Sequence, residues 1–299
     1  MCAQKLSHDE KWSRANTLFT AGLSASDFAL IGIPAHKSSL SPTSANLTPA
    51  AIREALARYS TFTGSTKTDL TKLEMVDLGD VTDPDFADGE AKVAKAVDNL
   101  LANHKLVMVL GGDNSITYSV ARGLWKDLSN IGVITFDAHH DLRDGQSNGS
   151  PIWRLIQSGL PGKNIVQIGI SDFANSAAYS KRAEDNGITV INRAMMRSQS
   201  IEKIVTDALA IAGANGREIY VDVDVDVCDR SVAPACPASV PGGITADELR
   251  NAVRLVAKDL RVRAIDITEI DAALDTPDQR TIRLAALLVL EAAAGVASR

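Results

Sequence analysis

The sequence predicts a three-layer α/β fold built around a mostly parallel sheet of about eight strands. Eight apolar, β-rich runs alternate with segments of helical spacing, which is the pattern of a sheet covered by helices on both faces. No internal repeat interrupts this alternation. Several of the runs end in acidic or imidazole-bearing residues, and open α/β sheets place their ligands at such strand ends.

The most informative strands lie in the middle and later parts of the chain. The run at 106–110, LVMVL, is fully apolar, and the run at 132–136 is similar in length and composition, as in strands buried on both faces. Segment 220–229 reads YVDVDVDVCD, and its alternation puts Asp222, Asp224 and Asp226 on one face. A solvated edge strand is the alternative for this segment. The remaining strands are expected at 28–33, 75–78, 164–170, 188–191 and 263–268.

Helices are expected between these strands. Thr48 precedes Pro49 and is expected to be the N-cap of a helix over 48–59. Asp247 and Glu248 stand in the first turn of the segment 245–260, where negative charge favours a helix. The other helices are expected at 90–104, 115–125, 151–158, 174–184, 201–211 and 280–297.

Length and composition indicate a globular protein of one domain, 1–299, in which 1–24 form an N-terminal extension. The net charge of −6, with mixed signs along the chain, argues against a nucleic-acid or membrane surface. The N-terminus is polar and no 18-residue apolar run occurs, so neither a signal peptide nor a membrane span is expected. Cys2, Cys228 and Cys236 are too few for a disulfide framework. We therefore expect a cytoplasmic protein, with Cys228 and Cys236 as small buried thiols.

Acidic and imidazole groups gather at the ends of four predicted strands. Asp137, His139 and Asp141 follow the strand at 132–136 at spacings of two, and such groups converge on one point when the backbone turns there. Carboxylate oxygens with an imidazole favour Mn²⁺ over a thiolate-seeking metal. Two such ions lower the pKa of a water molecule enough to form hydroxide near neutral pH, which predicts metal-assisted hydrolysis. The other strand ends carry Asp113 with Asn114, Asp224 with Asp226, and Glu269.

Three motifs resemble the signatures of the ureohydrolase family, which contains arginase, agmatinase and formimidoylglutamase. They are GGDNS at 111–115, DAHHD at 137–141 and DVDVCD at 224–229. The resemblance extends from about residue 30 to residue 295. It implies an arginase-like fold, two Mn²⁺ ions, a small-molecule substrate and a homo-oligomer, either a trimer or a hexamer. It also implies that Asp137 and Asp224 bridge the ions, that Asp141 binds the first ion, and that His139 and Asp226 bind the second.

Two positions near the expected metal ligands depart from the family pattern. Asn114 stands where the family supplies a histidine to the first metal ion, and a neutral amide oxygen would be a poorer ligand. Asp222 stands where the family often has serine, and we expect this extra carboxylate to offset the lost imidazole in part. A metal-poor family member that acts as a binding subunit is therefore an alternative. The expected catalytic residues are Asp137 and Glu269, because Glu269 in ITEID matches the family glutamate that pairs with a cationic guanidinium or formimino group.

The loop after the DAHHD motif at 137–141 indicates the substrate class. DAHHDLR with SNGSP at 147–151 looks more like formimidoylglutamase than arginase or agmatinase. Arg143 stands where arginase usually places an asparagine that contacts the substrate, and a guanidinium can pair bidentately with a carboxylate. Asn148, where arginase has a histidine thought to relay protons, is expected to line the substrate site with Glu269. The expected substrate is N-formimino-L-glutamate, cleaved in histidine degradation; a guanidino acid such as guanidinobutyrate, or an arginase-like substrate, is the alternative.

The remaining polar residues have simpler explanations. His140 is expected to be a packed, hydrogen-bonded core histidine, because alternation points it away from the metal ligands. Arg154 is expected at the surface, and Asp113 suits either an N-cap or an acceptor behind the metal ligands. Gly111 and Gly112 lack the full pattern of a phosphate-binding loop. Ordinary loop or surface positions are expected for His8, His36 and His104.

Overall fold

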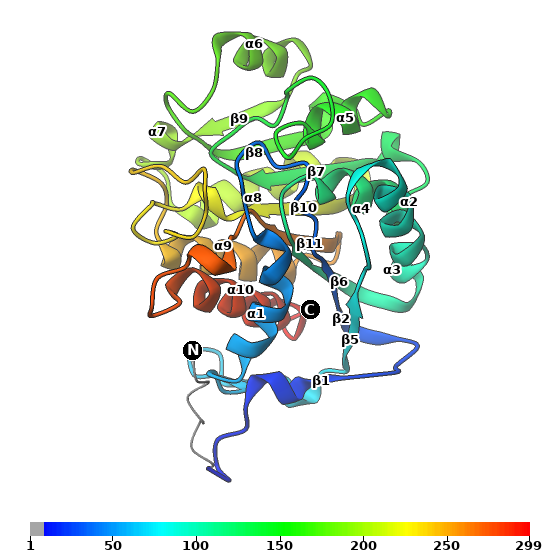
Figure 1. Cartoon of the computed structure of the whole chain (residues 1–299), viewed down its shortest axis with the longest axis vertical. Coiled ribbons are helices and arrows are strands. Elements are labelled where there is room, and N and C mark those ends of the chain that lie inside the picture. The colour runs from blue at the N-terminus through cyan, green and yellow to red at the C-terminus, as the bar shows by residue number, and fades with distance from the viewer. Residues whose placement is uncertain (1–8) are drawn as a thin grey trace.

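A nine-stranded parallel sheet forms the centre of the protein in a computed structural model that describes residues 9–299 (Figure 1). The strand order is β1-β5-β2-β6-β11-β10-β7-β8-β9, and every neighbouring pair is parallel. The predicted fold class is therefore confirmed. In chain order the strands are β1 (Phe19–Thr20), β2 (Ser26–Ile33), β5 (Met75–Asp80), β6 (His104–Gly111), β7 (Ile131–Phe136), β8 (Ile165–Ile170), β9 (Thr189–Asn192), β10 (Glu218–Asp224) and β11 (Val262–Thr268).

All eight predicted strands are present, and the structure adds three short ones. Strand β1 lies within the expected N-terminal extension and extends the sheet by pairing with Met75 and Val76. A separate antiparallel hairpin joins β3 (Phe62–Thr63) to β4 (Thr68–Asp69). Each of these three strands has two residues, which is too short for an alternation pattern to reveal. His8 and Cys2 lie outside the described residues.

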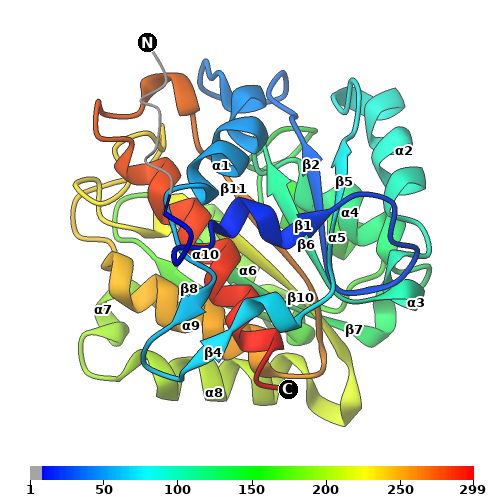
Figure 2. The same cartoon turned by 90° about the horizontal axis from the view of Figure 1, so that it is seen from below.

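Helices cover both faces of the sheet and complete the three layers. One face packs against α1, α8, α9 and α10, and the other against α2, α4 and α5 (Figures 1 and 2). The α-helices are α1 (Thr48–Leu56), α2 (Phe86–Val97), α3 (Leu100–Asn103), α4 (Ile116–Leu124), α5 (Pro151–Gln157), α6 (Ala177–Asp185), α7 (Arg193–Met196), α8 (Ile201–Ala212), α9 (Ala246–Lys258) and α10 (Arg280–Val296). The 3₁₀ helices are η1 (Ala15–Leu18), η2 (Ala45–Leu47), η3 (Leu70–Lys72), η4 (Leu128–Asn130), η5 (Gly162–Asn164), η6 (Ala214–Gly216), η7 (Val225–Val227) and η8 (Ala272–Leu274).

Two predictions about helices and one about the exposure of a histidine were wrong. The helix expected over 90–104 is divided, because Asn99 takes a left-handed conformation (φ 64°) between α2 and α3. Thr48 is the first residue of α1 and not its N-cap, since its hydroxyl donates to the carbonyl of Ile270 at 2.5 Å. His104 is buried at the start of β6, where its Nδ1 lies 2.8 Å from Ser26 Oγ.

Apolar side chains on the two sheet faces form two separate cores. The larger core includes Phe28, Phe136 and Leu288, and the smaller core includes Val107 and Trp125. Cys228 and Cys236 are free and fully buried, as expected. Within residues 9–299 there is no helix with the length and apolar character needed to cross a membrane.

The strand order brings the four polar strand ends together. Strands β6, β11, β10 and β7 are consecutive neighbours, and the acidic motifs follow their C-terminal ends. Gly112, just after β6, is required by close packing, because a Cβ there would lie 1.9 Å from the carbonyl oxygen of Ala35. This packing explains Gly112 without a phosphate ligand.

Candidate active site

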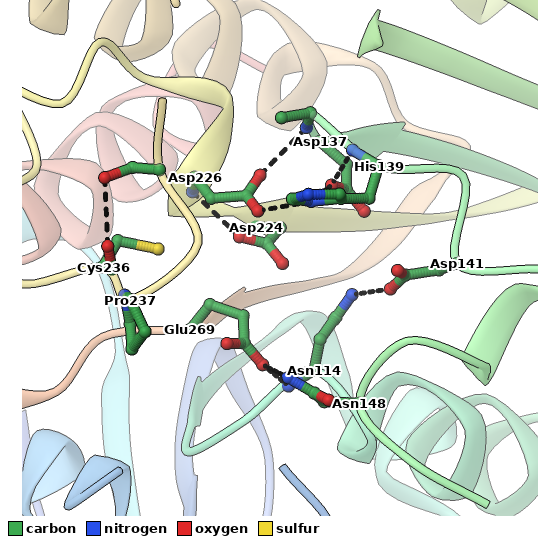
Figure 3. A network of polar contacts seen from close by, with 12 residues as sticks. Asn114, Asp137, His139, Asp141, Asn148, Asp224, Asp226, Cys236, Pro237 and Glu269 are labelled. Atoms are coloured by element: carbon green, nitrogen blue, oxygen red, sulfur yellow. Dashed lines mark hydrogen bonds and ion pairs between the residues drawn. The ribbon is translucent and has the colours of Figure 1, made fainter. Parts of the chain in front are cut away.

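The predicted metal ligands converge in one buried region at the C-terminal ends of β7 and β10 (Figure 3). Ligand atoms of Asp137, His139 and Asp226 all lie within 4.8 Å of one another. His139 Nδ1 is 2.7 Å from Asp226 Oδ2 and 3.5 Å from Asp137 Oδ1. Backbone amides orient both carboxylates, since Ala138 N donates to Asp226 and His139 N donates to Asp137. These three side chains could therefore hold one divalent cation.

Burial and mutual repulsion shift the pKa values in this cluster. Burial raises the pKa of Asp137 well above its usual range, and the charges of Asp141 and Asp226 add to the effect. Burial raises the pKa of Asp224 well above its usual range too, with repulsion from Asp226 and Asp137. Burial opposes the charge on His139, but attraction to Asp226 and Asp137 outweighs it and raises the pKa to about 12. Such a cluster is stabilised by a cation, because its carboxylates lack enough positive partners.

One oxygen in the cluster is free to bind an ion. Asp137 Oδ2 is buried and has no hydrogen-bond partner within the described residues. A buried carboxylate oxygen without a donor is costly. Together with the carboxylate and imidazole donor set, this unpartnered oxygen fits Mn²⁺.

Asn114 and Asp141 lie on the other side of the site and contact each other directly. Asn114 Nδ2 donates to Asp141 Oδ2 at 2.6 Å, while Asn114 Oδ1 accepts from Thr117 and Thr268. Burial raises the pKa of Asp141 to about 7, and His139 and the Asn114 amide act in the opposite direction. The amide oxygen of Asn114, which was expected to be a metal ligand, thus faces two threonine hydroxyls.

Glu269 follows β11 in a conformation that few non-glycine residues adopt. Its φ is 63°, and Asp141 likewise has a φ of 52°; such strained residues concentrate at functional sites. Glu269 Oε1 accepts from Asn114 N at 2.7 Å and from Asn148 Nδ2 at 2.9 Å. Burial raises the pKa of Glu269 to about 8, with repulsion from Asp113.

The expected substrate residues line one cavity of about 370 Å³ together with four of the predicted metal ligands, His139, Asp141, Asp224 and Asp226. Arg143 is exposed, and its guanidinium lies 5.9 Å from the centre of the Tyr179 ring. Asn148 uses its amide oxygen to accept from Leu40 N and its amide nitrogen to reach Glu269. Asn148 thus connects the cavity rim to Glu269.

Asp222 lies on β10, two residues before Asp224, and is fully buried. Neither carboxylate oxygen has a hydrogen-bond partner in the described part of the chain. Burial raises the pKa of Asp222 well above its usual range, and repulsion from Asp266 adds to this shift. The expectation that Asp222 adds negative charge to the metal centre stays a prediction.

The other polar predictions had mixed outcomes. His140 is a packed residue as expected, with Nδ1 at 2.7 Å from Gln167 Oε1. His36 lies in a loop, also as expected. Arg154 is not a free surface residue, because it forms two hydrogen bonds to Glu90 and stacks on Tyr118. Asp113 accepts from the amide and hydroxyl of Ser115 just before α4.

Sequence reasoning missed the residues behind Asn114. Thr117, Thr268, Asp266 and Tyr220 are all fully buried and hydrogen-bonded in a chain that leads to Asn114. Two signals pointed there: Thr117 follows Asn114 by three residues at the start of a helix, and Asp266 and Thr268 alternate on one face of β11.

Comparisons with known proteins agree with this geometry. The arginase family model matches residues 26–295. Formimidoylglutamase from Halalkalibacterium halodurans is 39% identical over 272 residues, which cover 88% of this chain and 85% of the relative. The crystal structure of formimidoylglutamase from Bacillus subtilis has a TM-score of 0.92 and 33% identity, with 99% of this chain and 95% of that chain covered. The structure of Trypanosoma cruzi formiminoglutamase with Mn²⁺ has a TM-score of 0.87 and 26% identity, with 96% and 99% covered. The chain therefore belongs to the arginase family and is a hydrolase of C–N bonds in linear amidines.

Proposed function

We propose that this chain hydrolyses N-formimino-L-glutamate to L-glutamate and formamide, with Mn²⁺ as its cofactor. One observation carries the choice of substrate: buried Glu269 and exposed Arg143 line the same cavity. A cationic formimino group suits the carboxylate, and a substrate carboxylate suits the guanidinium. The formimidoylglutamases of Halalkalibacterium halodurans and Bacillus subtilis support the same assignment.

The proposed metal ligands are the residues that meet at the strand ends. Asp137 and Asp224 would contribute to both ions, Asp141 to the first alone, and His139 and Asp226 to the second alone. We propose two Mn²⁺ ions, although Asn114 presents its amide nitrogen to Asp141 and contributes no oxygen in this arrangement. When bound, the ions would supply a hydroxide nucleophile from water near neutral pH and stabilise negative charge on the reacting atoms.

The side chains of the cavity would bind and orient the substrate. Glu269 would pair with the protonated formimino group, whose positive charge favours the ionised carboxylate. Arg143 would hold a substrate carboxylate at the mouth, and Asn148 would line the cavity and keep Glu269 in place. The oxygen of water forms a bond to the formimino carbon, and the bond from that carbon to the glutamate nitrogen breaks. The departing nitrogen takes up a proton, which yields glutamate and formamide.

The test is glutamate release from N-formimino-L-glutamate by metal-stripped protein, before and after Mn²⁺ is added. We expect Mn²⁺-dependent release that is lost in Asp137→Ala. A panel of guanidinobutyrate, arginine and agmatine tests the alternative substrates. Faster hydrolysis of a guanidino acid would overturn the proposed substrate. If no compound reacts, the alternative of a metal-poor binding subunit replaces it.

Arg143 provides a second test, of substrate selection alone. Arg143→Ala should raise KM for N-formimino-L-glutamate about 10- to 100-fold, since a hydrogen bond to a charged group contributes about 1.5–3 kcal/mol. Arg143→Lys keeps the charge but not the planar fork, so its KM should lie between the two. An unchanged KM in Arg143→Ala would exclude this contact.

The resemblance also supports a homo-oligomer, trimer or hexamer, that works in the cytoplasm in histidine degradation. Light scattering on the purified protein tests the assembly, and a monomer would contradict it.

A further inference from the structure

The orientation of the Asn114 amide can be deduced from its neighbours. A carboxylate accepts hydrogen bonds and cannot donate them, so the 2.6 Å contact with Asp141 requires the nitrogen of Asn114 on that side. The amide oxygen must then lie on the opposite side, against Thr117 Oγ1 at 2.8 Å and Thr268 Oγ1 at 3.1 Å. Both threonines are buried, so no bulk water can replace their hydroxyls.

The Thr117 hydroxyl lies within hydrogen-bond distance of two acceptors, Asn114 Oδ1 and Asp266 Oδ2. Thr117 Oγ1 also lies 2.9 Å from Asp266 Oδ2, yet its hydroxyl has only one hydrogen. Asp266 already accepts from Tyr220 OH and from Val223 N. Asp266 Oδ2 thus already accepts the Tyr220 hydrogen and does not depend on Thr117 for a donor. The Thr117 hydrogen can therefore go to Asn114 Oδ1.

We propose that Thr117 and Thr268 are positioning residues that hold the Asn114 amide with its nitrogen toward Asp141, and through it set the geometry of the metal centre. This inference rests on the proposed Mn²⁺ function and adds residues to that site. Thr117 and Thr268 contact Asn114 from different elements, α4 and β11, and Thr268 is 154 residues away in the chain. Without either hydroxyl, the amide loses one of the two donors that fix its orientation.

Thr135 offers a matched control on the same sheet. It is fully buried, as Thr117 is, but its hydroxyl has no hydrogen-bond partner among the described residues. It lies on β7 beside Asp222 of β10. Valine has nearly the shape of threonine, so Thr135→Val removes a buried hydroxyl without affecting the Asn114 amide.

The experiment measures Mn²⁺ affinity by calorimetry on metal-stripped protein, without substrate. Thr117→Val and Thr268→Val should each weaken Mn²⁺ binding about 3- to 10-fold, somewhat less than the 10- to 100-fold typical when a direct partner of a metal ligand is lost. Thr117→Ser and Thr268→Ser, which keep the hydroxyl, should restore the affinity. Thr135→Val should bind Mn²⁺ like the wild type. In active enzyme, the valine variants should lower kcat at saturating Mn²⁺ with little change in KM.

A second readout does not depend on the metal ion. The side-chain amide of Asn114, assigned with Asn114→Ala in ¹⁵N-asparagine-labelled protein, should exchange its hydrogens faster in Thr117→Val and Thr268→Val than in Thr135→Val. Equal exchange in all three variants, or equal Mn²⁺ affinity, would overturn the positioning role. Failure to hydrolyse N-formimino-L-glutamate would overturn the proposed function alone, because neither readout uses that substrate.

Discussion

The two ends of the same sheet differ in how completely their polar side chains are paired. At the C-terminal ends of β7 and β10, buried carboxylates outnumber their donors, and Asp137 and Asp222 keep oxygens without partners in the described residues. At the N-terminal ends the polar groups are paired. Glu218 accepts from Trp125 Nε1 at 2.7 Å and from Arg263, and His104 bonds Ser26.

This difference assigns metal binding to one end of the sheet and a contribution to stability to the other. Crowded carboxylates with raised pKa values oppose folding when they ionise, and a bound cation would remove that cost. The paired groups at the other end contribute to stability but provide no open ligand. Changes at the C-terminal end should therefore alter Mn²⁺ binding, while changes at the N-terminal end should alter stability alone.

The largest effect is expected from Asp226→Asn. Asp226 is the carboxylate nearest the imidazole of His139, at 2.7 Å, and belongs to the cluster that is arranged to hold an ion. Loss of a partner behind a metal ligand typically costs 10- to 100-fold in metal affinity, so loss of a ligand should cost at least about 100-fold. Calorimetric Mn²⁺ titration of metal-stripped protein measures it.

Asp88→Asn is the matched control, because Asp88 is exposed in the first turn of α2. It removes the same charge from an exposed position outside the cluster and the cavity and should leave Mn²⁺ affinity unchanged. If Asp226→Asn bound Mn²⁺ as tightly as Asp88→Asn, Asp226 would have no place in the metal centre.

Glu218→Gln should give the reverse pattern. It weakens the hydrogen bonds to Arg263 and Trp125, but the side chain is 40% exposed, so water replaces part of what is lost. We expect the free energy of unfolding to fall by about 1 kcal/mol, measured by urea denaturation. Mn²⁺ affinity should change by less than about twofold, because separate sites act nearly independently. A large loss of Mn²⁺ affinity would show that the two ends are coupled.

Much of this fold follows from local patterns in the sequence. The strands β6 and β7 are recognisable because a short, fully apolar run has few other stable arrangements in a buried sheet. Strand β1 is not recognisable, since two residues carry no pattern and its place depends on Met75 and Val76. The prediction of a surface position for His104 failed because its partner, Ser26, is 78 residues away.

The site, like the fold, was predictable where local sequence patterns determine it and not where distant contacts do. Strand ends carry their polar residues in sequence motifs, so the convergence of Asp137, His139 and Asp226 could be expected before the strand order was known. The direction of the Asn114 amide could not, because it depends on Thr268 from a distant strand. Motifs indicate which residues meet, whereas their hydrogen bonds depend on tertiary packing.

The smallest expected effect is on the pH dependence of stability, and it concerns His104 at the N-terminal end of the sheet. Burial lowers the pKa of His104 from 6.5, the opposite of the rise to about 12 at His139. Above pH 6.5 His104 is neutral in both folded and unfolded protein and has no effect on the pH dependence of stability. As the pH falls below 6.5 the unfolded chain binds a proton first, so stability is lost through that range.

His104→Asn removes this proton uptake and keeps a side chain that can bond Ser26. In chelator-treated protein, the free energy of unfolding should therefore fall less between pH 7.5 and pH 5.5 in the variant than in the wild type. The crowded carboxylates titrate alike in both proteins and cancel from the comparison. An equal fall in both would mean that His104 takes up its proton without unfolding. The N-terminal end would then tolerate an added charge, and the contrast between the two ends would be confined to the carboxylates.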